Sequence, residues 1–210
     1  MGGEFNRREP TNTSRIHLHP DVVDIFRRHH WLGFFEFLRG YDDDIAHDFA
    51  MELNPRSRTS ATTMMRGISI TINLEVISRL TTLPQWVQWR REDKNSSTFA
   101  KKNFSLDDEE PIEDKSGVRR ESLPYPWDEV SYHILKFISC EGRLGVVYDY
   151  QFRLFHELRF RDDLPINQRL SVPYFLLHSI IDINQKVREG KHQQLAHHGL
   201  IKLIMEDTLN

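Results

Sequence analysis

Eleven histidines are the side chains of this 210-residue chain that most invite a chemical role. Imidazole nitrogens bind transition metals and exchange protons near neutral pH. His17-Leu18-His19 would present two imidazoles on one side of an extended segment, whereas the adjacent pairs His29-His30 and His197-His198 would point in different directions on a helix. None of these spacings matches the HExxH or Cys/His patterns of zinc sites. We therefore expect neither a metal ion nor a cofactor.

The sequence gives no stronger indication of nucleophilic or acid–base catalysis than of a metal site. Cys140, the only cysteine, follows a predicted helix, and the C-terminal end of a helix disfavours a thiolate. His133 and His156 fall on apolar faces, where a histidine more often belongs to the core, and Glu157 is too close to His156 in sequence to face it. The chain contains no Gly-rich phosphate loop, no GxSxG and no GxGxxG. We therefore expect no catalytic residues. An unrecognised hydrolase or nuclease is the alternative, and it would need a pocket that gathers acids and histidines.

The aspartates Asp42-Asp43-Asp44 are the densest group of carboxylates near the N-terminus. They lack the spaced oxygen ligands and the glycine of a calcium loop. Carboxylates also stabilise the N-terminal end of a helix. Because Ile45, Phe49 and Leu53 follow on one stripe, we expect a helix that starts at these aspartates and ends at Asn54-Pro55.

The region from about residue 92 to residue 123 loses all periodicity and carries its charge in blocks. Lys101-Lys102 precede the acidic run from Leu106 to Asp114, and Arg119-Arg120 follow it. We expect a long exposed loop, partly disordered, whose blocks either pair with one another or contact a basic partner. Together with the two tryptophans before it, this loop supplies the candidate interaction surface: Trp86, Trp89, Asp107, Asp108, Glu109, Glu110, Arg119 and Arg120.

The clearest structural pattern runs from Ala61 to Pro84. Apolar and polar residues alternate on both sides of Arg66-Gly67, as in a half-buried strand pair with a tight reversal. Asn73 is a good N-cap for a helix with apolar residues at helical spacing, and Leu83-Pro84 should end that helix. We therefore predict a small β-hairpin near residues 62–71 that leads into an amphipathic helix.

Helical periodicity covers most of the remaining chain. We expect further helices that start near Pro20, at Asp128 and at Ser171, and others from about Val146 to Phe160 and around Leu200. The predicted fold class is mainly α: a single helical domain over residues 19–210 with one small β-hairpin. Residues 1–18 are expected to be a vector-derived scar, MGGEF, and a disordered lead-in.

Composition excludes several functional classes. A hydrophobic content of 39% fits a globular protein, and a net charge of −3 gives no strong attraction to nucleic acid or anionic membranes. The arginine pairs Arg27-Arg28, Arg90-Arg91 and Arg119-Arg120 form no continuous stripe. No run of 18 apolar residues and no signal peptide is present, and one cysteine cannot form an internal disulfide. We expect an intracellular protein, nuclear or cytoplasmic, that does not bind membranes.

Several short motifs occur in an order shared with a known family. They are Phe49-Ala50-Met51-Glu52-Leu53, Met65-Arg66-Gly67, Ile72-Asn73, Leu83-Pro84, Leu176-Leu177-His178-Ser179-Ile180 and Ile183-Asn184. In this order the chain, from about Pro20 to Thr208, resembles the plant transposon protein domain akin to the gag-region first-open-reading-frame proteins of Athila-type retrotransposons. It departs from the family pattern where Ala50 replaces an aromatic residue and where His197 to Ile204 stands for a late F-P-x-L-I-T-x-L-C motif.

The resemblance implies a non-enzymatic, transposon-derived, gag-like module of a plant protein, and the family brings no catalytic residues with it. We therefore expect a protein-interaction or assembly domain that binds a protein partner or itself. A nucleic-acid-binding accessory protein is the less favoured alternative, and it would show salt-sensitive retention on DNA or RNA.

Overall fold

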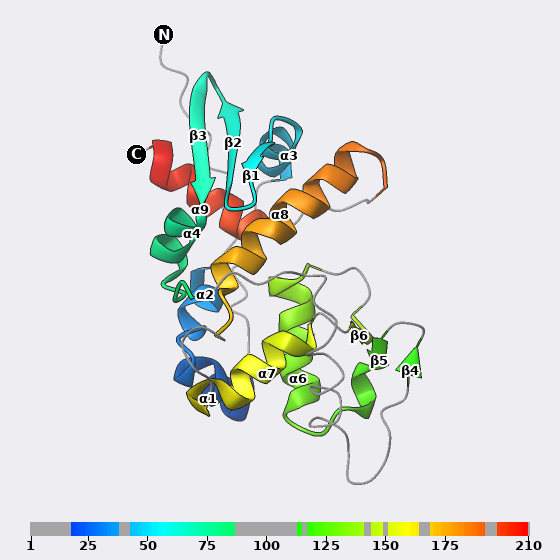
Figure 1. The fold of residues 1–210 in the computed structure, drawn as a ribbon. Coiled ribbons are helices and arrows are strands. Elements are labelled where there is room, and N and C mark those ends of the chain that lie inside the picture. Colours follow the sequence, from blue (N-terminus) through cyan, green and yellow to red (C-terminus); the bar gives the residue numbers. More distant parts are fainter. Residues whose placement is uncertain are drawn as a thin grey trace.

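The computed structural model describes residues 18–37, 43–86, 113–114, 117–140, 144–148, 151–163, 169–191 and 197–209. Figure 1 shows helices gathered around the base of a three-stranded sheet, from which two strands, β2 (Ser60–Met65) and β3 (Ile68–Asn73), extend outward. A smaller sheet lies at the far end of the molecule. The architecture is therefore mixed: mainly helical, with a β element at each end.

The first sheet is antiparallel and has the order β1-β2-β3, with β1 spanning Asn54–Ser57. Between β2 and β3, Arg66 has a φ of 51° and Gly67 a φ of 80°. Two positive values in a two-residue connection define a type I′ turn, whose twist matches that of the strands. The hairpin predicted near residues 62–71 is confirmed. Strand β1 was not predicted, because Asn54-Pro55 indicates only the end of a helix.

One face of the β2–β3 hairpin belongs to the core. Ala61 and Met65 of β2 and Ile70 and Ile72 of β3 are buried, whereas Thr62, Met64 and Thr71, which point to the other face, are more exposed. This alternation of apolar and polar positions is the pattern that predicted the strands. Thr63, also buried, donates its hydroxyl hydrogen to the carbonyl of Phe49 at 3.1 Å, so a polar side chain on the core face is satisfied by helix α3 (Asp43–Met51).

Helix α4 (Leu74–Thr81) continues directly from β3. Its N-cap is Asn73, whose side-chain oxygen accepts the backbone N–H of Val76 at 2.9 Å, as predicted. It ends at Thr81, because Thr82 adopts a left-handed conformation before Leu83-Pro84.

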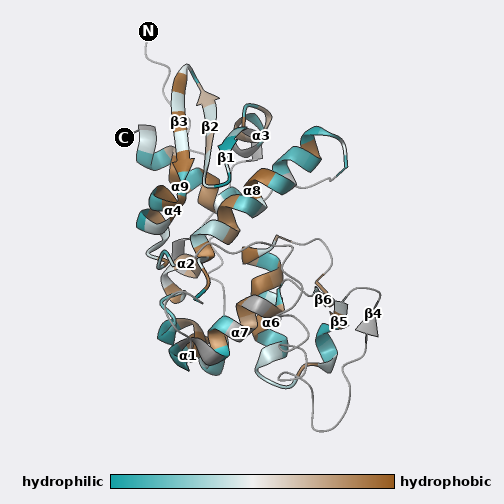
Figure 2. Ribbon diagram, viewed as in Figure 1, coloured by the Kyte–Doolittle hydropathy of each residue, from teal (hydrophilic) through white to brown (hydrophobic). Residues whose placement is uncertain are grey.

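Together with α3 and α4, six further α-helices build the body of the described part of the chain. They are α1 (Pro20–Arg28), α2 (Leu32–Phe37), α6 (Trp127–His133), α7 (Phe152–Phe160), α8 (Val172–Arg188) and α9 (His198–Leu209). α3 contacts β2, α8 and α9, and α4 contacts α8 and α9, so one part of the core lies between the sheet and these helices. The same buried cluster continues through α1, α2, α6 and α7. Figure 2 shows the apolar residues of these helices as brown segments that alternate with polar ones.

The second sheet corrects two predictions. β4 (Glu113–Asp114), β5 (Gly117–Arg119) and β6 (Val146–Tyr148) pair antiparallel, and residues 120–122 form a 3-10 turn. The end of the predicted loop at 92–123 is thus ordered by pairing with β6. The helix predicted from Val146 begins only at Phe152, because residues 146–148 are this third strand. The prediction of a single hairpin in an otherwise helical domain was therefore wrong.

Of two further predicted helix N-caps, one is confirmed and the other is wrong. Ser171 caps α8 by accepting the N–H of Tyr174 at 3.3 Å, as predicted. The predicted N-cap Asp128 instead lies inside α6, which begins at Trp127 after a cis Tyr125-Pro126 bond. No helix in the described residues has the length and apolarity needed to cross a membrane.

Candidate interaction surface

Among the predicted interaction residues that the structure describes, Trp86 lies apart from Arg119 and Arg120. Trp86 follows α4 and is half-buried, with the guanidinium of Arg169 over its ring at 5.4 Å from the centroid. Arg119 and Arg120 lie in and after β5. In Figure 1, α4 and β5 are on opposite sides of the molecule. The other members of the predicted surface fall outside the described residues: Trp89, Asp107, Asp108, Glu109 and Glu110.

The two arginines have different surroundings. Arg119 is exposed, and its guanidinium lies 3.6 Å from the Glu121 carboxylate. Arg120 is half-buried: its guanidinium lies over the ring of Tyr132 at 5.5 Å and donates to the carbonyl of Asp128 at 3.5 Å. Arg120 therefore joins the second sheet to α6, and of the two arginines only Arg119 is exposed to a partner.

His133 is a core histidine, as its apolar face predicted. It is 5% exposed, stacks on Phe137 with ring centroids 6.1 Å apart, and meets Phe26 and Phe35 edge-on. Burial and, secondarily, the nearby Lys136 lower the pKa of His133 to about 4. The imidazole is thus neutral at physiological pH, because the aromatic pocket cannot solvate a charge.

A cysteine and a histidine that are distant in sequence meet in the structure. The Cys140 sulfur lies 3.5 Å from Nδ1 of His197. Both residues have positive φ, 49° for Cys140 and 58° for His197. Cys140 follows a π-helical turn, Ile134–Ile138, that extends α6. No sequence signal joins these two positions, so their proximity was not predicted.

The electrostatics of this pair do not favour an activated thiol. His197 is 5% exposed, and burial, followed by the proximity of His198, lowers its pKa to about 3. An imidazole that stays neutral accepts a hydrogen bond from a thiol but does not stabilise a thiolate as an ion pair. The arrangement therefore holds the end of α6 against the start of α9.

Glu157 also has a structural role. It is 3% exposed, and its carboxylate accepts the backbone N–H of Leu170 at 3.1 Å, one residue before the N-cap of α8. A buried carboxylate must accept such hydrogen bonds to be tolerated in a core. Glu157 thus links α7 to the segment that leads into α8.

A hollow of about 350 Å³ opens between the C-terminal half of α8 and β1. The guanidinium of Arg188 closes one side of it by donating to the carbonyl of Leu53 at 2.6 Å. The remaining lining residues are Pro55, Ile181, Gln185 and Glu189. The hollow is only partly enclosed and its polar residues are exposed, so it lacks the features of an enclosed ligand pocket.

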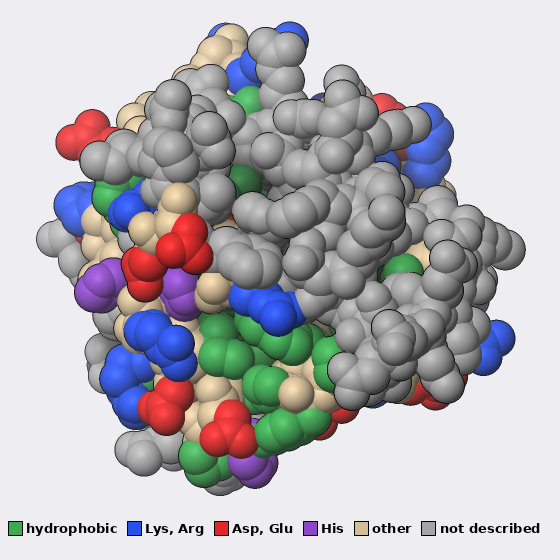
Figure 3. Space-filling model, turned by 60° about the horizontal axis from the view of Figure 1, so that its bottom comes forward, with side chains coloured by type: hydrophobic (Ala, Val, Ile, Leu, Met, Phe, Trp, Pro, Cys, Tyr) green, Lys and Arg blue, Asp and Glu red, His purple; other side chains and the backbone are tan. Residues whose placement is uncertain are grey.

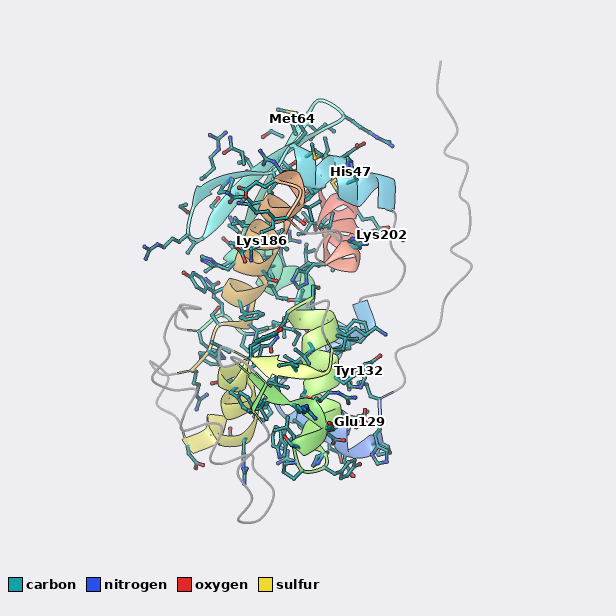
Figure 4. The ribbon with its side chains drawn as sticks, turned by 90° about the vertical axis from the view of Figure 1, so that its right-hand side faces the viewer. His47, Met64, Glu129, Tyr132, Lys186 and Lys202 are labelled. Atoms are coloured by element: carbon teal, nitrogen blue, oxygen red, sulfur yellow. The ribbon has the colours of Figure 1, made fainter. Side chains whose placement is uncertain are left out.

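Large apolar side chains are exposed at both ends of the molecule. At the hairpin end, Met64 of β2 is 49% exposed, Ile68 of β3 is 44% exposed and Met51 of α3 is 47% exposed. Figure 4 shows Met64 at this end together with His47 of α3, far from Tyr132 and Glu129 of α6. The hairpin end therefore combines exposed apolar groups with two strand edges.

At the other end, hydrophobic side chains gather beside charged groups on the face shown in Figure 3. Tyr125, 53% exposed, belongs to this end because its hydroxyl donates to Asp21 of α1 at 2.6 Å, with the His19 ring packed edge-on against it. The hydrogen bond to Asp21 raises the pKa of Tyr125 to about 12. Tyr125 thus fixes α1 to the turn before α6.

The two edges of the first sheet differ. β1 contains Pro55, which has no N–H, and its register shifts between Pro55 and Ser57. Proline and irregular register are features by which proteins prevent an edge strand from pairing with another chain. β3 reads Ile-Ser-Ile-Thr-Ile-Asn, with no proline, no charge and continuous register along β2. β3 is therefore the edge that is able to accept another strand.

Comparison of the chain with protein-family models, with curated proteins and with solved structures finds no match.

Proposed function

We propose that this chain is a protein-interaction or assembly module without catalytic activity of its own, and that the β2–β3 hairpin is its contact element. The observation that carries the proposal is the outer edge of β3, which is regular and uncharged and is flanked by exposed apolar side chains. When an extended segment of a partner adds to such an exposed sheet edge, main-chain hydrogen bonds supply the affinity.

The environments of three buried ionisable residues, His133, His197 and Glu157, support a structural role for them. His133 and His197 are buried with lowered pKa values, and Glu157 accepts a backbone hydrogen bond in the core. Each of these groups links secondary-structure elements. Packing of the core therefore explains why these three ionisable residues are present, without a catalytic role.

We also propose, from the sequence, that the chain has a transposon-derived, gag-like origin in a plant. Its support is the order of the motifs around Met65-Arg66-Gly67, Ile72-Asn73 and Leu83-Pro84. In the structure these residues form the I′ turn, the N-cap of α4 and the segment after that helix. A shared hairpin–helix unit would conserve such residue types for geometric reasons.

Site-specific photocrosslinking in cells would test the contact function. A benzophenone amino acid placed at Met64 or at Ile68 is expected to give discrete protein adducts. The same amino acid at Tyr125 is a matched control, because Tyr125 is exposed to a similar degree at the other end of the molecule. Adducts at the control position with none at the hairpin positions would reject the hairpin as the contact element.

A further inference from the structure

The outer edge of β3 determines which backbone groups are available to a partner. Because a two-residue I′ turn joins the strands, its flanking residues Met65 and Ile68 form a hydrogen-bonded pair, and such pairs alternate along an antiparallel ladder. Ile70 and Ile72 therefore also bond to β2. The N–H and C=O groups of Ser69 and Thr71 point away from the sheet, and both residues are exposed.

We propose that this edge pairs with the same edge of a second copy of the chain, so that two three-stranded sheets join into one antiparallel six-stranded sheet. This inference rests on the proposed function and names the partner for the same hairpin. A two-fold axis makes the contact self-complementary, since every contact from one copy to the other is repeated in the reverse direction.

Two conditions restrict the register, and among the registers that meet them we choose the one that pairs Ser69 with Thr71. In a continuous sheet, opposite residues must lie on the same face, and the outward-pointing residues must face each other. Both are met when Ile70 lies on the two-fold axis, because Ser69 then pairs with Thr71 of the second copy and Ile68 lies opposite Ile72. Four backbone hydrogen bonds form, and the half-exposed Ile68 becomes covered. Asn73 stays free to cap α4.

Charge selects the second copy as the occupant and antiparallel as the direction. Strand β3 is uncharged, but Arg66 precedes it and Glu75 follows it, and both side chains are exposed. With Ile70 on the axis, Arg66 of each copy lies opposite Leu74 of the other, one residue from Glu75 in the first turn of α4, whereas parallel pairing would bring like charges together. Within one copy the two residues lie at opposite ends of β3, so any favourable contact between them arises only between copies.

The position of the hairpin permits this contact. Figure 1 shows the turn of the hairpin projecting away from the helices, whereas α4 and the C-terminal end of α9 lie beside the base of β3. In the proposed register the turn of each copy reaches the start of α4 in the other.

The test measures the mass of the wild-type chain and of its variants by light scattering across a concentration series. The wild type is expected to approach twice the 25.0 kDa chain mass. Thr71→Pro removes an outward N–H that β2 does not use, so it should weaken the dimer about tenfold or more while the fold persists. Thr71→Val, which keeps that N–H, is the matched control and should remain dimeric.

Charge-reversal variants of Arg66 and Glu75 provide a second, independent test of the dimer. Arg66→Glu and Glu75→Arg are each expected to weaken the dimer, by up to about tenfold because two pairs are lost per dimer. The double variant should restore wild-type dimerisation. Circular dichroism of each variant checks that the fold is intact, so that loss of the dimer is not loss of the protein.

Amide hydrogen exchange locates the contact. Protection of the Ser69 and Thr71 amides should increase with protein concentration, whereas that of Ile70 and Ile72 should stay constant. A wild type that is monomeric throughout, or a dimer in which the Ser69 and Thr71 amides stay unprotected, would overturn the self-pairing. Hairpin photoadducts with a different protein would in that case leave the contact function standing, so the two proposals fail separately.

Discussion

The sulfur of Cys140 lies 3.5 Å from Nδ1 of His197, although 57 residues separate them in the chain. Each residue holds a left-handed backbone conformation that non-glycine residues seldom adopt. The contact fixes the end of the α6 extension to the start of α9. Because the buried imidazole of His197 stays neutral, it does not convert the Cys140 thiol to a thiolate.

We therefore predict that the Cys140 thiol reacts as an unactivated thiol. With a disulfide reagent such as DTNB, its rate should rise about tenfold per pH unit between about pH 6 and 8, because the thiolate forms only as hydroxide increases. His197→Ala should leave that slope unchanged. A rate that is already pH-independent below about pH 7 would reveal a thiolate–imidazolium pair and contradict this prediction.

Acid should destabilise the fold through the buried histidines. The pKa of His133 falls from 6.5 to about 4 in the folded chain, so below pH 6.5 the unfolded chain binds the proton first. The stabilising contribution is present above pH 6.5 and is lost as the pH falls toward 4. At about pH 5.5 the loss is about 1.4 kcal/mol, which corresponds to one pKa unit.

The variant His133→Phe isolates this effect, because the site is lined by aromatic rings. Urea unfolding at about pH 7.5 and pH 5.5 should show a pH-dependent loss smaller by about 1.4 kcal/mol in the variant than in the wild type. An identical loss in both proteins would show that His133 does not titrate as the structure implies.

The I′ turn makes Gly67 sensitive to substitution. A Cβ at this position would meet nothing within 4 Å, so the effect of Gly67→Ala comes only from its φ of 80°. We expect a loss of about 1–2 kcal/mol in the free energy of unfolding, measured in urea. Gly67→Asn should lose less, since asparagine tolerates this conformation. Equal losses for alanine and asparagine would point to a cause other than the backbone.

Gly117 is required for a different reason, namely close packing of β5 on β6. A Cβ there would lie 2.6 Å from Cγ1 of Val146 and 2.7 Å from the carbonyl oxygen of Val147. Because a backbone atom cannot move aside cheaply, Gly117→Ala should destabilise the fold by about 1–3 kcal/mol. Gly145→Ala is the matched control: nothing lies within 4 Å of its Cβ, and thermal unfolding should be nearly unchanged. Similar melting temperatures for the two variants would argue against the β5–β6 register.

The cap of α4 gives a further test. Asn73→Ala removes the acceptor for the Val76 N–H and should reduce the free energy of urea unfolding by about 1 kcal/mol. Asn73→Ser, which keeps a capping oxygen, should lose at most a few tenths of that value. If serine were as damaging as alanine, the capping bond would not be the cause.

The sequence by itself determined the features that depend on neighbouring residues. The reversal at Arg66-Gly67, the cap at Asn73 and the start of α8 at Ser171 were all predicted, because turn and cap preferences act within about four residues. The burial of His133 followed from its place on an apolar face.

The tertiary structure alone decided the contacts between distant segments. Val146–Tyr148 reads as helix locally but becomes a strand because Gly117–Arg119 pairs with it. The approach of Cys140 to His197 and the exposure of one edge of β3 likewise depend on how whole elements pack. Such outcomes are absent from local patterns, because the free energy that selects them comes from burial and pairing across the chain.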